Sequence, residues 1–464
     1  MLGLANLGPL GGLVRAAGLV LVAEMLAGGM LVGGCGGRTG LDGVLGSEGA
    51  PGEGAGVDDP RLDGGRDNDD DDDDDDDGRP PVDPPDLEVE LPEDPGPPDS
   101  GPRPPCVELP PGETVDALFR LQARLEAADV VFLVDITGSM NAELNRIRVE
   151  LSSEIVPALV DRIPDLELAV AVFADFPVEP YGTGFERPLV VIQDGTRDLA
   201  AVDEAAADVR RFGPTGDYAE SQIEALYQLM TGAGAGRFVD AADCPPGRRG
   251  AACLRETATP IVFLFTDAPS HNGVGGAFRY VGEVAEVAHG HGEAMDALRS
   301  AGARVLGFFS GDRDVHADAL LQLIEVGFAT ESVDTSGNVL VYDIGRNGER
   351  LSADVVTAVD ALVDEVPIED VRLELSGPGA RFVVDARPAG ARPPTGAEET
   401  PEGFAGVRPG TRLGFRLTLS NDLDPAETDG GPYLLNLVLV NEVGRPVARR
   451  RVQIVDPTRG GRCG

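Results

Sequence analysis

The chain has 464 residues, which is enough for two or three domains. Its formal net charge of -42 at pH 7 argues against nucleic-acid binding, because phosphate contacts need basic patches. Residues 36–105 are rich in Asp, Glu, Gly and Pro, and they include an unbroken aspartate run, Asp69–Asp77. Such a segment cannot bury enough apolar surface to offset its ordering entropy, so it is predicted to be a disordered tether. The run is interpreted as a self-repelling spacer, with a loose cation-binding tract as the alternative.

The first 35 residues are predicted to be an export signal. Arg15 supplies a positive charge, an apolar stretch follows it, and Val32–Cys35 closes the segment. Small residues before a Cys resemble the bacterial lipobox, which implies that Cys35 is lipidated and that a lipid anchor holds the protein at the membrane. Gly36 then implies an outer-membrane lipoprotein of the cell envelope, periplasmic or surface-exposed. A transmembrane anchor and a cleaved signal with an incidental Cys are the alternatives.

Predicted strands and helices alternate from Asp129 to the middle of the chain. The strands are expected at residues 130–134, 166–173, 188–192, 260–265, 304–309 and 339–342. The helices are expected at residues 141–163, 199–209, 218–230, 292–300, 317–326 and 353–363. This order predicts a doubly wound, Rossmann-like α/β domain with a mostly parallel sheet, assigned to residues 106–366.

The pattern changes after Pro367. Five strands separated by loops rich in Pro, Gly and Asp are expected there, at residues 371–375, 381–386, 412–419, 433–441 and 447–455. Helical periodicity is missing from this region of the sequence. Residues 367–464 are therefore predicted to form a small all-β sandwich, immunoglobulin-like in type.

Four cysteines remain if Cys35 is lipidated, and an even number in an exported protein suggests disulfide bonds. Cys244 and Cys253 flank a short loop, which favours a local bridge. Cys106 and Cys463 stand at the two ends of the predicted folded part and could join them. Three pairings remain open. A metal cluster is disfavoured because the usual C-x-x-C spacing is missing.

The pattern D-x-T-x-S follows the first buried strand, at Asp135, Thr137 and Ser139. A tight loop there can aim one carboxylate and two hydroxyls at one point, and oxygen ligands suit Mg²⁺, Mn²⁺ or Ca²⁺. Two neutral hydroxyls keep the ligand charge low, so the metal could also accept a carboxylate from outside. The alternative is that the aspartate caps the next helix and the hydroxyls belong to a turn.

Two segments carry a specific resemblance. Val131–Met140 resembles the opening of a von Willebrand factor A (vWA) domain, where D-x-[ST]-x-S begins the metal-ion-dependent adhesion site (MIDAS). Phe265–Ala268 resembles the later strand of that family, whose Asp completes the site. The resemblance covers about residues 125–366.

Within this family the likeness points to the I-like domain of the integrin β subunit. Phe173–Val178, followed by Pro180 and Tyr181, resembles the second strand and loop of that domain, and Asp217–Glu220 resembles its D-x-P-E motif. His271 follows the later strand and is placed at the rim of the site.

The resemblance implies two metal sites. A central Mg²⁺ or Mn²⁺ would be bound, in part through water, by Asp135, Thr137, Ser139, Glu220 and Asp267. An adjacent Ca²⁺ would share Glu220 and add Asp175, Asp217, the Ala219 carbonyl and Thr215. The family has Asn in place of Thr215 and Pro in place of Ala219, which leaves this loop less stiff. Of the two acids that a third site needs, only Glu143 is present, since Ala142 occupies the other position.

These expectations define a lipid-anchored surface or periplasmic protein that captures a protein ligand. An Asp or Glu of the partner would complete the metal coordination, as in adhesion. The alternative is a structural envelope or assembly scaffold whose metal site is closed by an internal carboxylate. Catalysis is not expected, because no general base is identifiable beside the open metal position. His289 and His291 are predicted to lie in a solvated loop, with a transition-metal site as the weaker reading.

Overall fold

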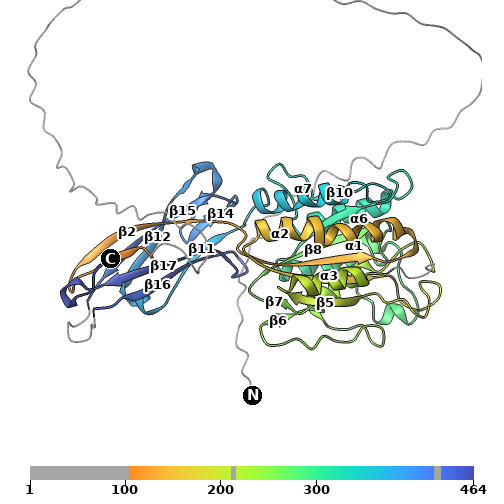
Figure 1. Cartoon of the computed structure of the whole chain (residues 1–464), viewed down its shortest axis with the longest axis horizontal. Coiled ribbons are helices and arrows are strands. Elements are labelled where there is room, and N and C mark those ends of the chain that lie inside the picture. Colours follow the sequence, from red (N-terminus) through yellow and green to blue (C-terminus); the bar gives the residue numbers. More distant parts are fainter. Residues whose placement is uncertain (1–103, 211–215, 423–429, 464) are drawn as a thin grey trace, which may run out of the picture. The chain divides into compact units, whose positions relative to one another are not determined.

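The computed structural model describes residues 104–210, 216–422 and 430–463, which form an α/β body and an all-β body (Figure 1). The predicted export signal, the lipidation site Cys35, the tether and Thr215 lie outside the described residues. No helix among the described residues is both long enough and apolar enough to cross a membrane.

The α/β body contains a six-stranded sheet in the order β10-β9-β8-β3-β4-β5. Neighbouring strands pair in parallel except β4 and β5, which are antiparallel. The strands are β3 (Ala127–Asp135), β4 (Asp165–Phe173), β5 (Val190–Thr196), β8 (Thr259–Thr266), β9 (Arg304–Phe309) and β10 (Val341–Asp343). A separate two-stranded hairpin is formed by β6 (Arg248–Arg249) and β7 (Leu254–Arg255).

The central strand β3 explains the continuous apolar run in the sequence. Every residue of β3 is buried. Successive side chains of a strand point to opposite faces. Val130 and Phe132 accordingly join one hydrophobic core, while Val131 and Leu133 join another on the opposite face of the sheet. A strand that is covered on both faces has no solvent-facing side, so its sequence does not alternate between apolar and polar residues.

Helices cover both faces of this sheet, which confirms the doubly wound α/β class. Four of them pack into the first core: α1 (Asn141–Glu150), α2 (Val156–Arg162), α3 (Leu199–Asp208) and α7 (Leu351–Asp364). Three pack into the second: α4 (Gln222–Thr231), α5 (His291–Ser300) and α6 (Ala317–Ala329). A π-helical turn, Leu151–Ile155, joins α1 to α2, so the predicted helix 141–163 is one nearly continuous helical segment.

Two predicted elements of the α/β body differ from the structure. Residues 188–192 were expected to form a buried strand, but β5 begins at Val190, lies at the sheet edge and is partly exposed. The helix expected from Tyr218 begins only at Gln222. The reason is local, because Glu220 forms a parallel bridge with Ser270 and is held in an extended conformation.

The all-β body is a sandwich of a six-stranded and a three-stranded sheet around one core. The order of the larger sheet is β1-β17-β16-β11-β14-β13, and that of the smaller is β12-β15-β2. Its strands are β1 (Cys106–Glu108), β2 (Thr114–Gln122), β11 (Val371–Ser376), β12 (Val383–Arg392), β13 (Glu398–Glu399), β14 (Gly403–Ala405), β15 (Arg412–Ser420), β16 (Tyr433–Val440) and β17 (Pro446–Val455). The predicted sandwich class is therefore found. The sheets differ from the four-plus-three arrangement of a constant-type immunoglobulin domain.

The start of the described chain belongs to the sandwich, which corrects the predicted boundary at residue 106. β1 pairs in parallel with β17, and β2 pairs in antiparallel register with β15 along its whole length, from Thr114 opposite Ser420 to Gln122 opposite Arg412. The α/β body is thus an insertion between two strands of the sandwich. Sequence patterns missed this because the partner strands lie far along the chain: Thr114 pairs with Ser420, and Cys106 pairs with Gln453.

Both disulfide bonds favoured by the sequence are present. Cys106 is bonded to Cys463, and Cys244 is bonded to Cys253. The first joins residues separated by 357 positions and ties β1 to the C-terminal end of the sandwich. The structure thereby chooses one of the three open pairings, and it agrees with an oxidising compartment.

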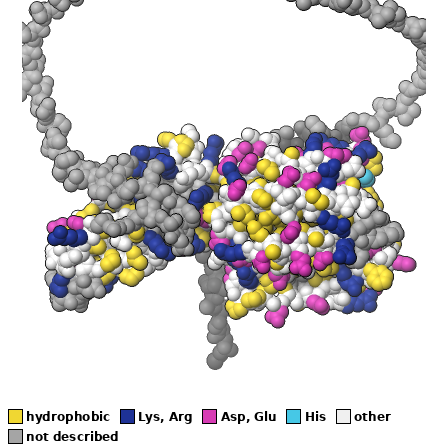
Figure 2. Space-filling view, in the orientation of Figure 1, with side chains coloured by type: hydrophobic (Ala, Val, Ile, Leu, Met, Phe, Trp, Pro, Cys, Tyr) yellow, Lys and Arg dark blue, Asp and Glu magenta, His cyan; other side chains and the backbone are white. Residues whose placement is uncertain are grey.

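A shallow apolar groove of about 450 Å³ lies between α2 and α3. Its walls include Val160 and Leu199, both of which are exposed, and hydrophobic side chains gather over these helices on the face drawn in Figure 2. None of the candidate metal ligands lines this groove.

The pairing of β2 with β15 predicts the effect of removing a large core side chain from β2. Phe119 is fully buried in the sandwich core, so Phe119→Ala should lower the free energy of unfolding by about 3–5 kcal/mol. Hydrogen exchange should accelerate in β15 and β17 and stay unchanged in β3. Val384→Ala on the exposed side of β12 is the control, with an expected change within about 0.5 kcal/mol. Faster exchange in β3 instead would place β2 in the α/β body.

Candidate metal centre

The candidate site lies where three neighbouring parallel strands end. In the sheet, β3 stands between β8 and β4, with Val134 opposite Phe265 and Asp135 opposite Phe173. The residues that follow these strands therefore meet at one edge. The chain also changes direction across the sheet here, because β4 is added on one side of β3 and β8 on the other. Ligands of open α/β sheets bind at such a switch point.

Asp135 ends β3 and is held by three hydrogen bonds. The backbone N–H and the hydroxyl of Thr137 donate to Asp135 Oδ1 at 2.9 and 2.6 Å. The hydroxyl of Thr266, at the end of β8, donates to Asp135 Oδ2 at 2.8 Å. These bonds leave a lone pair on Oδ2, and they fix the carboxylate in a fully buried position.

Ser139 and Asp267 form the outer part of the site. Ser139 Oγ donates to Asp267 Oδ1 at 2.9 Å and lies 3.4 Å from Thr137 Oγ1. Ser139 is exposed and Asp267 is half-buried, whereas Asp135 and Thr137 are buried. The oxygens of these four side chains thus run from the interior to the surface.

Glu220 reaches the same region from the loop before α4. Its backbone N–H donates to the Pro269 carbonyl, and its own carbonyl accepts from the His271 N–H, at 2.9 and 2.8 Å. The side chain is buried, and Glu220 Oε2 has no hydrogen-bond partner among the described residues. A buried carboxylate oxygen without a partner is costly unless a cation compensates it.

Burial is the main cause of the raised pKa values at the central site, and the charges of neighbouring acids add to it for Asp135 and Glu220. Burial, then the charge of Asp267, raises the pKa of Asp135 to about 7. Burial and the charges of Asp135 and Asp175 raise the pKa of Glu220 well above its usual range. Burial also raises the pKa of Asp267. Asp135, Glu220 and Asp267 therefore lie close together, and no described cationic side chain offsets the negative charge of all three carboxylates.

The residues present fit a hard divalent cation at the central site. Adjacent oxygen ligands of octahedral Mg²⁺ lie about 3 Å apart, given metal–oxygen distances of about 2.1 Å. The contacts among Asp135, Thr137, Ser139 and Asp267 span 2.6–3.4 Å. All of these donors are oxygens, and the unpartnered oxygen of Glu220 is a further one. Such a cation would offset the repulsion between the acids and present a Lewis-acidic face to solvent at Ser139.

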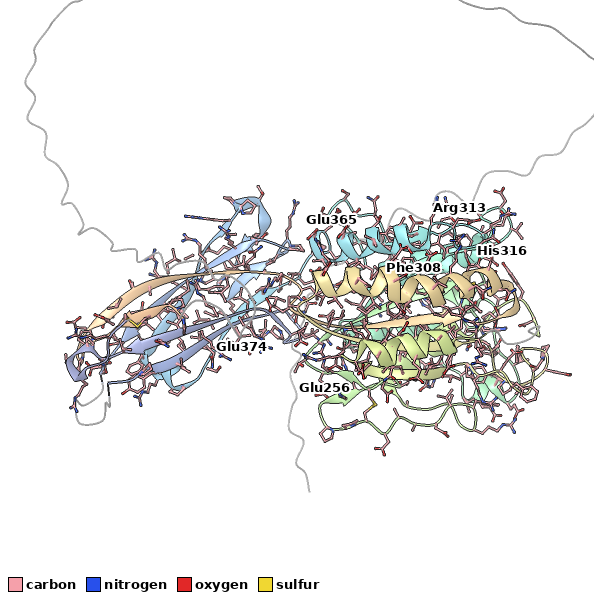
Figure 3. All side chains as sticks on the ribbon, in the orientation of Figure 1. Glu256, Phe308, Arg313, His316, Glu365 and Glu374 are labelled. Atoms are coloured by element: carbon pink, nitrogen blue, oxygen red, sulfur yellow. A yellow bond between two sulfur atoms is a disulfide. The ribbon has the colours of Figure 1, made fainter. Side chains whose placement is uncertain are left out.

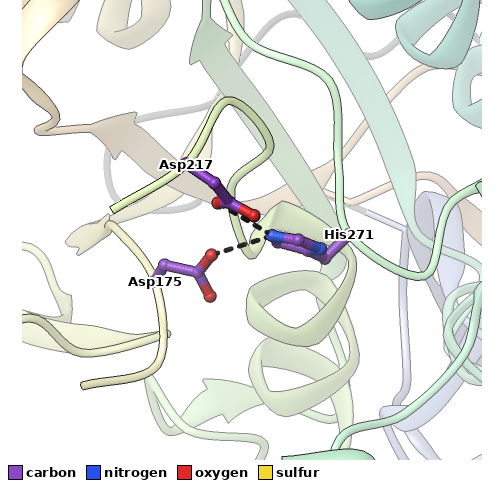
Figure 4. Close-up of side chains that lie close together, drawn as sticks. All are labelled: Asp175, Asp217 and His271. Carbon is purple, nitrogen blue, oxygen red and sulfur yellow. Dashed lines mark hydrogen bonds and ion pairs between the residues drawn. The ribbon is translucent and has the colours of Figure 1, made fainter. Parts of the chain in front are cut away.

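The second predicted site contains a histidine. His271 Nε2 lies 3.2 Å from Asp175 Oδ2 and 3.2 Å from Asp217 Oδ1 (Figure 4). Its other ring nitrogen, Nδ1, contacts the Phe278 carbonyl at 2.5 Å. Asp175 and His271 are buried, while Asp217 is exposed. Burial alone would lower the pKa of His271, but its interactions with Asp175 and Asp217 raise that pKa to about 9.

Aromatic side chains enclose this histidine. The His271 ring stacks on Tyr280 with a centroid separation of 4.2 Å and meets Tyr181 edge-on at 5.1 Å. The Tyr280 hydroxyl and the Phe176 N–H both donate to Asp175 Oδ1. Tyr181, which the sequence related to the integrin loop, is thus a wall of the second site.

The second site does not match the oxygen-only set predicted for Ca²⁺. Asp175 and Asp217 are brought together, and Ala219 is buried beside Glu220, but Thr215 lies outside the described residues. The ring of His271, which the sequence placed at the rim, stands between the two aspartates. Ca²⁺ takes oxygen ligands, so an imidazole nitrogen at this position is a poor fit.

Two residues that matter here, Thr266 and Glu186, were not predicted from the sequence. Thr266 precedes Asp267 and orients Asp135. Its position directly before a candidate ligand was the only feature of the sequence that could have indicated this role. Glu186 is buried, and Oε2 of its carboxyl has no hydrogen-bond partner among the described residues; burial raises its pKa. Glu143, noted for a third site, is also buried, and burial raises its pKa to about 7.

The rim of the central site carries aromatic side chains. Tyr218 is 42% exposed and Phe278 is 39% exposed, and their rings meet at 6.0 Å. Tyr218 also lies 5.8 Å from the ring of His316, whose charge acts on Asp267. Figure 3 places His316 and Arg313 at one end of the α/β body. The predicted solvated loop at His289 is instead packed, because His289 stacks on Tyr227 and contacts the buried carboxylate of Glu224.

Comparisons with known proteins give remote structural similarity only. No protein-family model matches the chain, and no curated protein matches it. A von Willebrand factor type A protein from Catenulispora acidiphila is 15% identical over 77% of this chain and 73% of its own, with a TM-score of 0.32. The pilus adhesin SpaC from Lactobacillus rhamnosus GG, in its open conformation, is 11% identical over 74% of this chain and 45% of its own, with a TM-score of 0.30. This chain thus spans less than half of that adhesin. The strand order described above defines the fold class without these matches.

Removing the Thr266 hydroxyl tests its role in orienting Asp135. Thr266→Val keeps the side-chain shape but leaves Asp135 Oδ2 without its donor, so Mg²⁺ or Mn²⁺ affinity should fall about 10- to 100-fold in isothermal titration. Thr259→Val, at the other end of β8, is the matched control and should bind like the unmodified protein. Equal affinities for the two variants would mean that Thr266 does not support the site.

The raised pKa values predict how stability depends on pH in a metal chelator. The pKa of Asp135 is about 7 in the folded state and near 3.8 when unfolded, so the folded protein holds more protons between these values. This contribution to stability is fully present below about pH 4 and is lost as the pH rises through about 7. The melting temperature of Asp135→Asn should therefore fall less steeply than that of the unmodified protein over this range. Parallel curves would contradict the pKa shift.

Proposed function

We propose that this protein captures a protein ligand through a divalent metal ion bound at the central site, Mg²⁺ or Mn²⁺. The observation that carries the proposal is the gradient of exposure across the candidate ligands. Asp135, Thr137 and Glu220 are buried, Asp267 is half-buried and Ser139 is exposed. A cation held by this set has protein on its inner side and solvent on its outer side, which leaves room for a ligand atom from a partner.

The partner group that suits this position is a carboxylate. Two of the candidate ligands, Thr137 and Ser139, are neutral hydroxyls, so an anion does not take every coordination position, and a hard cation with an open position favours an anionic oxygen. The exposed rings of Tyr218 and Phe278 stand beside the site and provide apolar contact area for the residues next to that carboxylate. The partner is therefore a protein segment that presents Asp or Glu. The proposal concerns binding and assigns no catalytic residue.

The proposal also covers the cellular location of the protein and the family to which its metal site belongs. The lipobox at Cys35 and the acidic tether support display from a lipid anchor in the outer membrane, periplasmic or surface-exposed, and the two disulfide bonds support an oxidising compartment. The D-x-T-x-S motif at the end of β3 and the approach of Asp267 and Glu220 support a MIDAS of the vWA type. The closeness of Asp175 and Asp217 agrees with the integrin β-like version, and the imidazole of His271 between them is a departure from it.

Thermal unfolding in Mg²⁺ tests whether the folded protein binds the metal at this site. At a free concentration of about 100 times the Kd, binding to the folded state alone should add about 2.7 kcal/mol of stability. Asp135→Ala should remove this gain. Asp296→Asn, an exposed aspartate on α5, should retain it. A gain of the same size in Asp135→Ala would show that the stabilising metal binds elsewhere.

Capture of carboxylates is tested with paired peptides on the immobilised full-length protein. Peptides that contain Asp or Glu should be retained in Mg²⁺ or Mn²⁺ and released by chelator. Their Asn and Gln counterparts should not be retained, because a neutral amide is a weaker ligand for a hard cation. The proposal fails if retention is unaffected by the metal, or if the amide peptides bind equally well.

A further inference from the structure

We propose that the second site is a mixed nitrogen–oxygen site for a first-row transition metal of the Zn²⁺ type, held by Asp175, Asp217 and His271. This inference goes beyond the proposed function, since it concerns a different ion and a different set of side chains. It also replaces the calcium ion that the sequence resemblance implied.

The geometry around His271 Nε2 is that of a metal ligand set. Nε2 is equidistant, at 3.2 Å, from one oxygen of Asp175 and one of Asp217. Both separations are longer than the about 2.7–2.9 Å of a direct charge-assisted hydrogen bond, so the two carboxylates share one weakly held nitrogen. Ligands bound to one tetrahedral Zn²⁺ at about 2.0–2.2 Å lie about 3.3–3.6 Å apart. The observed spacing of 3.2 Å is close to this, and the three ligand atoms all lie within 4.8 Å of one another.

A buried, unpartnered oxygen points into the same space. Asp175 is fully buried, and its Oδ1 accepts hydrogen bonds from the Tyr280 hydroxyl and the Phe176 N–H. Its Oδ2 accepts no hydrogen bond from the described residues, and its one polar contact there is the 3.2 Å ion pair with His271 Nε2. One oxygen is thus held by two donors and the other faces the histidine alone, as in a monodentate metal carboxylate.

The other ring nitrogen and the ring faces of His271 also make contacts that are typical of a metal-bound histidine. His271 Nδ1 contacts the Phe278 carbonyl, which can only accept, so Nδ1 carries a proton. A backbone carbonyl on the second nitrogen fixes the ring and leaves Nε2 as the metal ligand. Tyr280 and Tyr181 pack against the ring and exclude water from one side. Imidazole suits Zn²⁺ and its neighbours, and it does not suit Ca²⁺.

The test is ¹⁵N NMR of the full-length protein labelled at histidine. The chain has only four histidines, so each imidazole can be followed, and the aspartate run of the tether does not contribute to this signal. One equivalent of Zn²⁺ should shift Nε2 of a single imidazole, and a tenfold excess of Ca²⁺ should not. The shift should vanish in His271→Gln and persist in His289→Gln. Asp217→Asn should weaken Zn²⁺ binding at least tenfold. Because the side chain of Asp217 is exposed, this variant should still fold, so it tests the site even if His271→Gln misfolds.

Two results would overturn the proposal. One is that no imidazole responds to Zn²⁺, or that the responding one survives in His271→Gln. The other is that His271 keeps both ring protons at pH 7 in excess Zn²⁺, which would make the imidazolium itself the resident cation. Asp267→Asn separates this inference from the proposed function. It should abolish retention of carboxylate peptides and leave the His271 signal intact.

Discussion

Mutual repulsion among buried carboxyls at one edge of the sheet is the constraint on which the rest of the site depends. Asp135, Glu220 and Asp267 are brought together because β3 and β8 are parallel neighbours and because Glu220 is bridged to the segment after β8. The two hydrophobic cores hold the strands in this arrangement, so the acids cannot move apart without cost. The divalent cation that we propose would offset this repulsion. We infer that the clustered carboxyls govern both the stability of this edge of the sheet and, through a bound cation, its ability to bind a partner.

The two neighbouring sites each bring carboxylates close together, but they do so with different accompanying side chains. At the centre, hydroxyls of Thr137 and Ser139 accompany the acids, and the outermost of these groups is exposed. Beside it, the imidazole of His271 stands between Asp175 and Asp217 and is enclosed by aromatic rings. The first arrangement suits a hard ion that exchanges ligands with solvent. The second, as proposed, would suit an ion of the Zn²⁺ type, bound beside the segment that carries Asp217 and Glu220.

The sequence predicted what is local, and it missed what depends on distant contacts. The strand and turn at Asp135 were predictable because a doubly buried strand and a D-x-T-x-S loop are encoded in adjacent residues. β2 was assigned to the wrong body because its partner β15 is far away along the chain, and half-buried strands look alike. His271 was placed only at the rim, since its position depends on the Phe278 carbonyl and the Tyr280 ring. Thr266 gave no signal apart from its place before Asp267.

Anomalous scattering from crystals of the protein grown with Mn²⁺ would show whether a metal binds at this edge of the sheet. We expect a manganese peak in contact with Asp135, Thr137 or Ser139, and Asp267, at metal–oxygen distances of about 2.1–2.3 Å, with at least one water on the solvent side. That water marks the position which a partner carboxylate would take. A peak confined to exposed carboxylates elsewhere, or no peak at this edge of the sheet, would mean that the central site does not bind the metal. A fully protein-coordinated ion would contradict its proposed role in capture.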